Sequence, residues 1–176
     1  MIRDATASDV ERIAEIKARN WADTYGPLVP RDVLGPFLDK ERSAEQLRSK
    51  IRSPDTLLLV APSRGVVQGF ALTYMARTPE PWLESLHVLR NERGRGLGKL
   101  LIRATAKRLI AAGYHSMSLG VILGNDGASR FYQRLGAVLV RVEPVDFADG
   151  VEHTVWRWPD LTGQLGGEEG FEPSTV

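Results

Sequence analysis

A basic, glycine-rich segment is the part of this chain best suited to hold a phosphate group. It reads Arg93-Gly94-Arg95-Gly96-Leu97-Gly98-Lys99 and leads into a stretch, 97–112, whose leucines and alanines follow helical spacing. Glycines let a backbone turn sharply and approach a ligand closely. The N–H groups at a helix start have no partner within the helix, and together with the helix dipole they attract anions. We therefore expect residues 93–99 to bind a phosphate compound through backbone N–H groups and side-chain charge.

The spacing within this segment excludes the two most familiar nucleotide-binding loops. A P-loop would need glycine in place of Arg93 and a serine or threonine in place of Leu100. The dinucleotide pattern Gly-x-Gly-x-x-Gly would need glycine in place of Lys99. A nucleotide-binding protein built on this loop is accordingly a disfavoured alternative.

A different pattern, Arg/Gln-x-x-Gly-x-Gly/Ala, fits residues 93–98, and a second motif lies downstream. In the second motif Asn125 precedes Phe131-Tyr132, and Gly136-Ala137 follows. The two motifs resemble the two signatures of the GCN5-related N-acetyltransferase (GNAT) superfamily, and segment 20–30 is similar to the first helices of many members. The resemblance is specific because both motifs occur in the right order and at the right separation.

The resemblance implies that the chain binds acetyl-CoA as a co-substrate and needs no metal. The loop 93–99 would hold the pyrophosphate, while Asn125, with Ser129 on the same helix, would bond the pantetheine arm. Asn125 has a simpler alternative role as a turn or helix-capping residue before Asp126-Gly127.

The strand before the loop is expected to contribute backbone groups to the same ligand. In the splayed sheet of the family, Leu86, His87 and Val88 lose strand partners on one side, so their backbone groups become open to the cofactor. An N–H donor near Val88 would stabilise charge that develops on the acetyl carbonyl oxygen. The side chains of Leu86 and Val88 are at the same time suited to the core.

Tyr132 and Glu84 are the candidate catalytic residues. The family places a tyrosine near the CoA sulfur, and a phenol with a pKa of about 10 is able to protonate a thiolate or to hydrogen bond to it. Many members carry a glutamate on the preceding strand where this chain has Trp82, and Glu84 lies two residues on, on the same strand face. Glu84 is then the expected general base for an amine that must arrive neutral. Glu80 and His87 are poorer alternatives, and some relatives need no dedicated base.

The acceptor that the resemblance implies is a primary amine of a small molecule or peptide, which attacks directly in a ternary complex. Trp21, Tyr25 and Trp82 are aromatic candidates for the wall of its cleft, although Trp21 equally suits the core. The loop 144–150 and the adjacent Glu143 carry carboxylates that would attract a cationic amine, or would simply be solvated. The sequence does not identify the amine.

A non-catalytic acyl-CoA-binding sensor or interaction module on the same fold is the competing function. Such a protein would keep the loop 93–99 and dispense with the acid and the base. The presence of Tyr132 argues against it, whereas Trp82 in place of the usual glutamate argues for it.

The composition excludes several other classes of protein. A chain of 176 residues with a net charge of +1 suits one domain without the global field that draws nucleic acid or membrane. No run approaches the roughly 18 apolar residues of a membrane span, and the N-terminus lacks a signal-peptide core, so we expect a cytoplasmic protein. The absence of cysteine excludes disulfides and a cysteine acyl-enzyme, and the three histidines lack metal-ligand spacing. A homodimer is expected only at the level of the family.

The elements that must position these residues follow an irregular order. Strands are predicted at 2–5, 57–61, 66–75, 82–89, 115–121, 137–142 and 153–158, and helices at 8–26, 31–39, 43–52, 97–112 and 128–135. This order predicts an α/β fold with a mixed central sheet. The resemblance implies the GNAT fold, in which about seven strands are flanked by helices and the sheet is splayed between strands 82–89 and 115–121. We expect one N-acetyltransferase domain at 1–160 and a flexible tail at 161–176, where glycines and glutamates oppose packing.

Overall fold

The computed structural model describes residues 1–166, which form an α/β fold around one seven-stranded mixed sheet. The strands are β1 (Arg3–Asp4), β2 (Thr56–Ser63), β3 (Val66–Tyr74), β4 (Trp82–Val88), β5 (Met117–Ile122), β6 (Val138–Pro144) and β7 (Glu152–Trp158). The α-helices are α1 (Val10–Asn20), α2 (Arg31–Leu38), α3 (Lys40–Ile51), α4 (Leu97–Ala111), α5 (Asp126–Arg134) and α6 (Leu161–Leu165). Short helical turns are η1 (Ala7–Asp9), η2 (Trp21–Tyr25) and η3 (Arg90–Glu92). The predicted fold class is confirmed.

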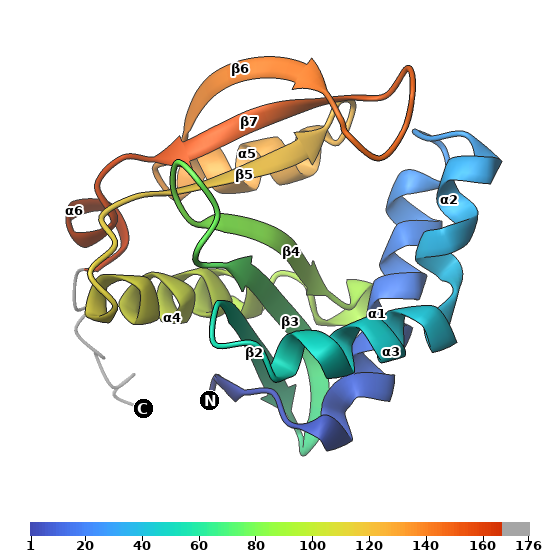
Figure 1. Cartoon of the computed structure of the whole chain (residues 1–176), viewed down its shortest axis with the longest axis horizontal. Helices are drawn as coiled ribbons and strands as arrows, with labels where there is room; N and C mark the ends of the chain where they lie inside the picture. The colour runs from blue at the N-terminus through green and yellow to red at the C-terminus, as the bar shows by residue number, and fades with distance from the viewer. Residues whose placement is uncertain (167–176) are drawn as a thin grey trace.

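At the centre of the sheet, two neighbouring strands pair at only two positions. The strand order is β1-β2-β3-β4-β5-β7-β6, and all neighbours are antiparallel except β4 and β5. These two strands run parallel and pair only at Trp82 with Ser118 and at Leu83 with Leu119. Beyond these pairs they diverge toward the side on which α1 and α2 lie (Figure 1). The predicted splay between these two strands is therefore confirmed.

A β-bulge marks the point at which the two strands separate. On β3, Leu72 pairs with Ser85 and the next residue, Thr73, pairs with Leu83, so Glu84 is an extra residue on β4. A bulge bends its strand and increases the local twist. The bulge thus turns the end of β4 away from β5 and sets Glu84 at the start of the opening.

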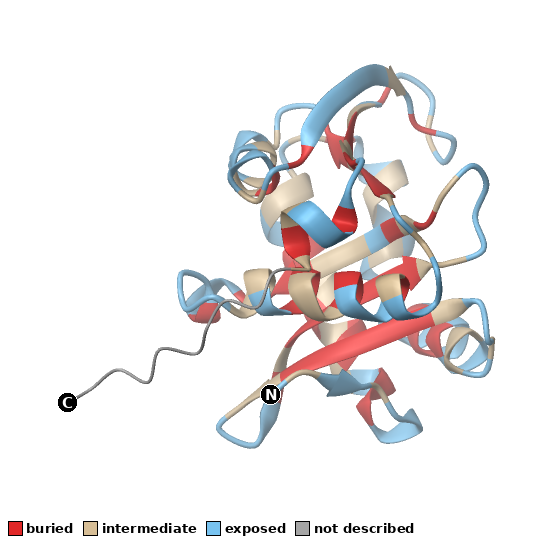
Figure 2. Ribbon diagram, turned by 90° about the vertical axis from the view of Figure 1, so that its left-hand side faces the viewer, coloured by how far each residue is buried: buried red, intermediate tan, exposed pale blue. Residues whose placement is uncertain are grey.

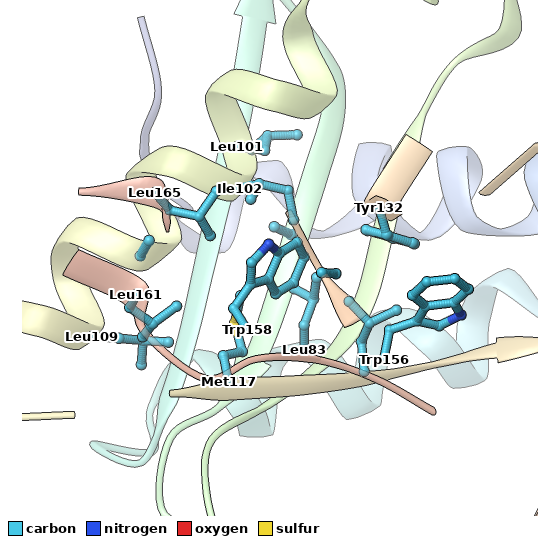
Figure 3. Close-up of a cluster of buried hydrophobic side chains, with 14 of the residues drawn as sticks. Leu83, Leu101, Ile102, Leu109, Met117, Tyr132, Trp156, Trp158, Leu161 and Leu165 are labelled. Carbon is cyan, nitrogen blue, oxygen red and sulfur yellow. The ribbon is translucent and has the colours of Figure 1, made fainter. Parts of the chain in front are cut away.

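The two faces of the sheet are covered by different helices. On one face, α1 and α3 bury a cluster with β2 and β3 that includes Ile13, Ile16 and Phe70. On the other face, α4, α5 and α6 share a cluster with strands from both halves of the sheet. Figure 3 shows Trp158 of β7 among leucines of α4 and α6, with Tyr132 of α5 beside it. The helix α4 therefore joins two sheet halves that hardly pair with each other.

A third cluster closes the open end of the sheet. Trp21 on the π-helical turn η2 packs with Ile122 at the end of β5 and with Val145 and Val151 from the loop before β7. Single π-turns within helices are frequent at functional sites. The edge strand β6 lies outside all three clusters and is largely exposed (Figure 2). Within residues 1–166, no helix has both the length and the apolar character needed to cross a membrane.

The start of the predicted tail is part of the core. Leu161 and Leu165 of α6 are 0% and 2% exposed, and both belong to the cluster under α4. Asp160 caps this helix by accepting a hydrogen bond from the Gly163 N–H at 3.1 Å. The prediction of a flexible segment was therefore wrong for residues 161–166, because two leucines four residues apart find an apolar site on α4. Residues 167–176 lie outside the described part of the chain.

The buried position of α6 predicts a stability effect. Replacement of Leu161 by alanine should lower the free energy of unfolding by about 2–5 kcal/mol, because it removes a fully buried side chain and leaves a cavity. The matched control is Leu139→Ala on the edge strand, where the side chain is 54% exposed and the cost should stay within about 0.5 kcal/mol. Urea unfolding of both variants measures the difference, and equal losses would contradict the assignment of α6 to the core.

Candidate functional site

A cavity of about 1230 Å³ follows the opening between β4 and β5. We call its two ends the loop half and the helix half. The loop half is lined by Arg93, Gly96, Lys99, Asn125, Phe131 and Tyr132. The helix half is lined by Lys17, Phe37, Lys50, Arg77, Glu84 and Phe147. The cavity thus joins the predicted phosphate loop to the predicted general base.

The backbone of the glycine-rich segment is shaped as a cradle. Gly94 and Gly96 have φ values of +81° and +82°, and a Cβ atom built on either would meet nothing within 4 Å. Glycine is therefore required here for its left-handed conformation and not for lack of space. The first bond of α4 runs from the Leu100 N–H to the Gly96 carbonyl at 3.0 Å. The N–H groups of Leu97 and Gly98 lie in the first turn of α4, where backbone N–H groups point toward a ligand and favour an anion.

Glycine is required at position 98 because a side chain there would have too little space. A Cβ atom at this position would stand 3.1 Å from Cζ of Phe131 on α5. The start of α4 and the second sequence motif are therefore in direct contact, although they are far apart in the chain. This close approach brings the two predicted halves of the cofactor site together.

The charged side chains of the loop are partly used within the protein. Arg93 donates from Nε to the Val88 carbonyl at 3.1 Å. Arg95 forms an ion pair with the buried Glu92 at 3.5 Å and is not among the residues that line the cavity. Lys99 does line the cavity. The backbone, Arg93 and Lys99 therefore define the loop half, and Arg95 stabilises the loop from outside.

The free edge of β4 presents the backbone of alternate residues. The Leu89 N–H bonds to the Gln68 carbonyl on β3 at 2.9 Å, so His87, two residues earlier, also turns its backbone toward β3. The backbone groups of Leu86 and Val88 therefore face the opening, whereas those of His87 face β3, because β-strand amides alternate in direction.

The two alternative bases named from the sequence, Glu80 and His87, both have polar contacts within the protein. His87 is 8% exposed and packs on Phe70, and burial lowers the pKa of its imidazole to about 3. Asn20 lies 3.3 Å from His87 Nδ1 and donates to the Val88 carbonyl at 3.1 Å. Glu80 accepts hydrogen bonds from Ser116, Ser118 and Arg157. Glu80 is not among the residues that line the cavity, whereas His87 does line it but is a weak base because burial lowers its pKa.

The Tyr132 side chain lines the loop half of the cavity and also belongs to the hydrophobic cluster beneath it. It is 7% exposed and contacts Phe131 and Trp158 edge to face. Burial, with a smaller effect of the nearby Tyr25, raises the pKa of its phenol well above the ordinary value of 10. The phenol is therefore neutral throughout the ordinary pH range.

Asn125 performs the structural role that the sequence left open. It caps α5 by accepting a hydrogen bond from the Ala128 N–H at 3.3 Å, and its side chain also bonds to Tyr25. It nevertheless lines the cavity, so both roles are compatible. Ser129, one turn further along α5, is not among the lining residues. A hydroxyl at that position is therefore a weaker candidate than Asn125 for a cofactor contact.

Glu84 occupies the bulge and faces the helix half of the cavity. Its carboxyl is reached by solvent through the open cleft, yet the surrounding protein desolvates it enough to raise its pKa above the ordinary value. Lys50, Arg77 and a hydrogen bond with Trp82 oppose this effect. Trp82 and Glu84 both line the cavity, as expected if their side chains share one face of β4.

Aromatic side chains from three segments form one wall of the helix half. Trp21 stacks on Phe37 with ring centroids 3.7 Å apart and planes 4° from parallel, and Phe147 meets both rings edge-on. Trp21 is buried and also lines the cavity, so a place in the core does not exclude contact with a ligand there. Glu143, named as an attractor of cationic amines, is bonded to Arg141 and His153.

Sequence reasoning missed most of the helix half. Lys17, Phe37, Lys50 and Arg77 come from separate elements that only the fold brings together. One signal was present in the chain, since Lys17 falls on the apolar stripe of α1, four residues after Ile13 and four before Trp21. A lysine on a buried stripe indicates a polar cavity beneath that helix.

Comparison with known proteins confirms the resemblance. The model of the acetyltransferase (GNAT) family matches residues 14–137. YuaI of Bacillus subtilis, named an uncharacterized N-acetyltransferase, is 26% identical over 92% of this chain and 94% of its own length. The fold matches the PaiA N-acetyltransferase of Thermoplasma acidophilum in complex with coenzyme A, with a TM-score of 0.77, 22% identity and coverage of 89% and 96% of the two chains.

A second solved structure has the same fold. YncA of Salmonella typhimurium, in a structure with its cofactor acetyl-CoA, has a TM-score of 0.71 at 23% identity, with 92% of this chain and 93% of that chain covered. The two motifs, the splayed sheet and the family match over residues 14–137 agree with one another. The chain therefore belongs to the GNAT family and is an N-acetyltransferase.

Proposed function

We propose that this protein transfers an acetyl group from acetyl-CoA to a primary amine of a small molecule or peptide, by direct attack within a ternary complex. The observation that carries the proposal is the continuous cavity that joins a glycine anion cradle to a desolvated carboxylate through the opening of the sheet. The PaiA and YncA structures, with coenzyme A and acetyl-CoA, support the choice of donor.

The residues of the loop half fit the donor. The N–H groups of Leu97 and Gly98, with the positive charge of the Lys99 side chain that lines the cavity, suit a pyrophosphate. Leu86 and Val88 offer backbone groups along an unpaired strand edge, which suits the amide groups of an extended pantetheine arm. When bound, acetyl-CoA supplies a thioester whose acyl carbon is open to attack by an amine.

The transfer forms one bond and breaks another. The lone pair of the amine nitrogen forms a C–N bond to the acyl carbon, and the electrons of the C–S bond leave with the sulfur. One proton is lost from the nitrogen and one is gained by the sulfur, so the products are an amide and a free thiol. The chain's own groups have to take the first proton, stabilise charge on the carbonyl oxygen and stabilise the sulfur.

Glu84 is assigned the first task and Tyr132 the last. Desolvation raises the pKa of Glu84, which makes the carboxylate a stronger base than an exposed glutamate. Burial makes the phenol of Tyr132 less acidic than a thiol of ordinary pKa near 8.5, so complete proton transfer to the sulfur is unfavourable. Tyr132 therefore acts by donating a hydrogen bond to the departing thiolate. The Val88 N–H is the donor assigned to the carbonyl oxygen.

The cradle predicts a selective loss of acetyl-CoA binding in Gly96→Glu. A side chain at φ +82° strains the turn, and a carboxylate there repels the pyrophosphate, so affinity should fall at least about 100-fold. The matched control is Gly65→Glu in the β2–β3 turn, where φ is +77° and space is equally open but no cavity is near. Isothermal titration calorimetry measures both variants, and unchanged affinity in Gly96→Glu would remove the loop as the site.

The assignment of Tyr132 predicts a turnover defect in Tyr132→Phe. The ring and its packing remain, so acetyl-CoA affinity should stay within a few-fold while kcat falls about 100-fold, as for loss of one charge-stabilising donor. Tyr114→Phe, which removes a hydroxyl outside the cavity, is the control. Thiol release in steady state reports kcat, and equal rates for wild type and Tyr132→Phe would reject the role.

The assignment of Glu84 predicts a change in pH dependence. In the wild type, kcat should rise with pH as the carboxyl loses its proton, with a midpoint above the ordinary glutamate value because desolvation raises the pKa. In Glu84→Gln, kcat should fall about 100-fold and keep rising to higher pH, where the amine itself loses its proton. A profile whose shape is unaltered in this variant would exclude Glu84 as the base.

The same assay tests the competing function. A sensor would bind acetyl-CoA at the loop half yet release no thiol with any amine. Absence of turnover across neutral, anionic and cationic amines, together with tight acetyl-CoA binding, would replace the enzyme by the sensor.

A further inference from the structure

Three cationic side chains from three elements surround one carboxylate in the helix half of the cavity. Lys17 lies on α1, Lys50 near the end of α3, and Arg77 just after β3, and all three line the cavity with Glu84 of β4. The positive charge of each of them lowers the pKa of the Glu84 carboxyl, against the larger, opposite effect of desolvation. The group is outside both sequence motifs.

Each cation is held by an aromatic ring and not by an acid. Lys17 Nζ lies 5.6 Å from the centroid of Phe37, Lys50 Nζ lies 5.3 Å from that of Tyr74, and the Arg77 guanidinium lies 4.2 Å from that of Trp82. A ring positions a cation without cancelling its charge. Within residues 1–166, no ion pair joins any of the three to a carboxylate.

The cationic charge exceeds the acidic charge at this end of the cavity. Burial and the nearby Lys50 both lower the pKa of Lys17, which indicates that the two ammonium groups repel each other across the cleft. Other carboxylates that line the cavity do not relieve this repulsion, since Glu143 is bonded to Arg141 and His153, and Glu92 pairs with Arg95. Asp146, beside Phe147, is the remaining acid of the lining. A bound anion between Lys17 and Lys50 would be favoured by this excess.

We propose that the acceptor amine carries an anionic group, a carboxylate or a phosphonate, which binds between Lys17 and Lys50 while its ammonium lies against Glu84. The proposal rests on the acetyl-transfer function above and names its substrate class. It makes the acceptor a zwitterion such as an amino acid or an aminophosphonate. A polycationic amine is disfavoured, because it would add positive charge beside three cations that share one carboxylate, Glu84.

The experiment compares amines that differ only in the charged group. The panel is an amino acid, its carboxamide, its aminophosphonate analogue and the decarboxylated amine, for each of a few side chains, with spermidine as the polycation. We expect kcat/KM for the anionic members to exceed that for the carboxamide about 10- to 100-fold, the range of a charge-assisted hydrogen bond. The carboxylate and phosphonate arms show which anion fits. A preference for the carboxamide, the decarboxylated amine or spermidine would overturn the proposal.

Two variants test where the anion binds. Lys17→Gln and Lys50→Gln should each raise KM for the anionic acceptor about 10-fold or more, with little change for the carboxamide and none in acetyl-CoA affinity. Lys40→Gln, at the exposed start of α3 and outside the cavity, is the control and should change neither. Equal losses for anionic and neutral acceptors would show that the lysines only support the structure, and the anion subsite would be rejected.

Equilibrium binding separates this proposal from the proposed function. Calorimetry of the same panel with the CoA-bound protein needs no turnover. Tighter binding of the anionic members, lost in Lys17→Gln, would support the subsite even if acetyl transfer failed in every assay. Equal or weaker binding of the anionic members would overturn the subsite even if acetyl transfer were observed.

Discussion

The separation of β4 from β5 after two residue pairs is the constraint on which the site depends. A sheet that closed along its whole length would bond the backbone of Leu86 and Val88 to β5 and leave no cavity. The opening is stabilised from both sides. The extra residue Glu84 bends β4, and Asn20 and Arg93 both bond to the Val88 carbonyl, while β5 keeps six residue pairs with β7. Polar backbone groups are thus either satisfied by side chains or left facing a cavity.

The same opening divides the charges that surround it. On one side lie the helix start of α4 and the glycine cradle, which favour a phosphate group. On the other side, cations from α1, α3 and the segment after β3 surround Glu84. Burial acts differently on the ionisable groups between them. Both His87 and Glu84 line the cavity, but burial lowers the pKa of His87 and keeps it neutral, whereas it raises the pKa of Glu84 and makes its carboxylate more basic.

The comparison of sequence with structure is most informative at particular residues. The loop 93–99 and Tyr132 were predicted to share one site, and the loop, except Arg95, lines one cavity with Tyr132, because glycine spacing and a paired motif are local and specific. The backbone of His87 faces β3 and not the opening, because the direction of an amide depends on which strand it pairs with. Leu161 and Leu165 were missed because five residues give too short a pattern to reveal a buried face. Asn125 needed the structure to show that a helix cap also lines the cavity.

The sequence by itself determined the family and the mixed α/β fold, and it predicted a phosphate-binding loop, since these depend on residues close together in the chain. Only the tertiary structure decided which residues meet in the helix half of the cavity. Four separate segments of the chain carry Lys17, Lys50, Arg77 and Glu84, and no periodicity in the sequence relates these segments. Their meeting depends on how α1 and α3 pack on the sheet and on where the bulge in β4 falls. The net charge of the helix half comes from side chains of distant segments, so no single stretch of the sequence predicts it.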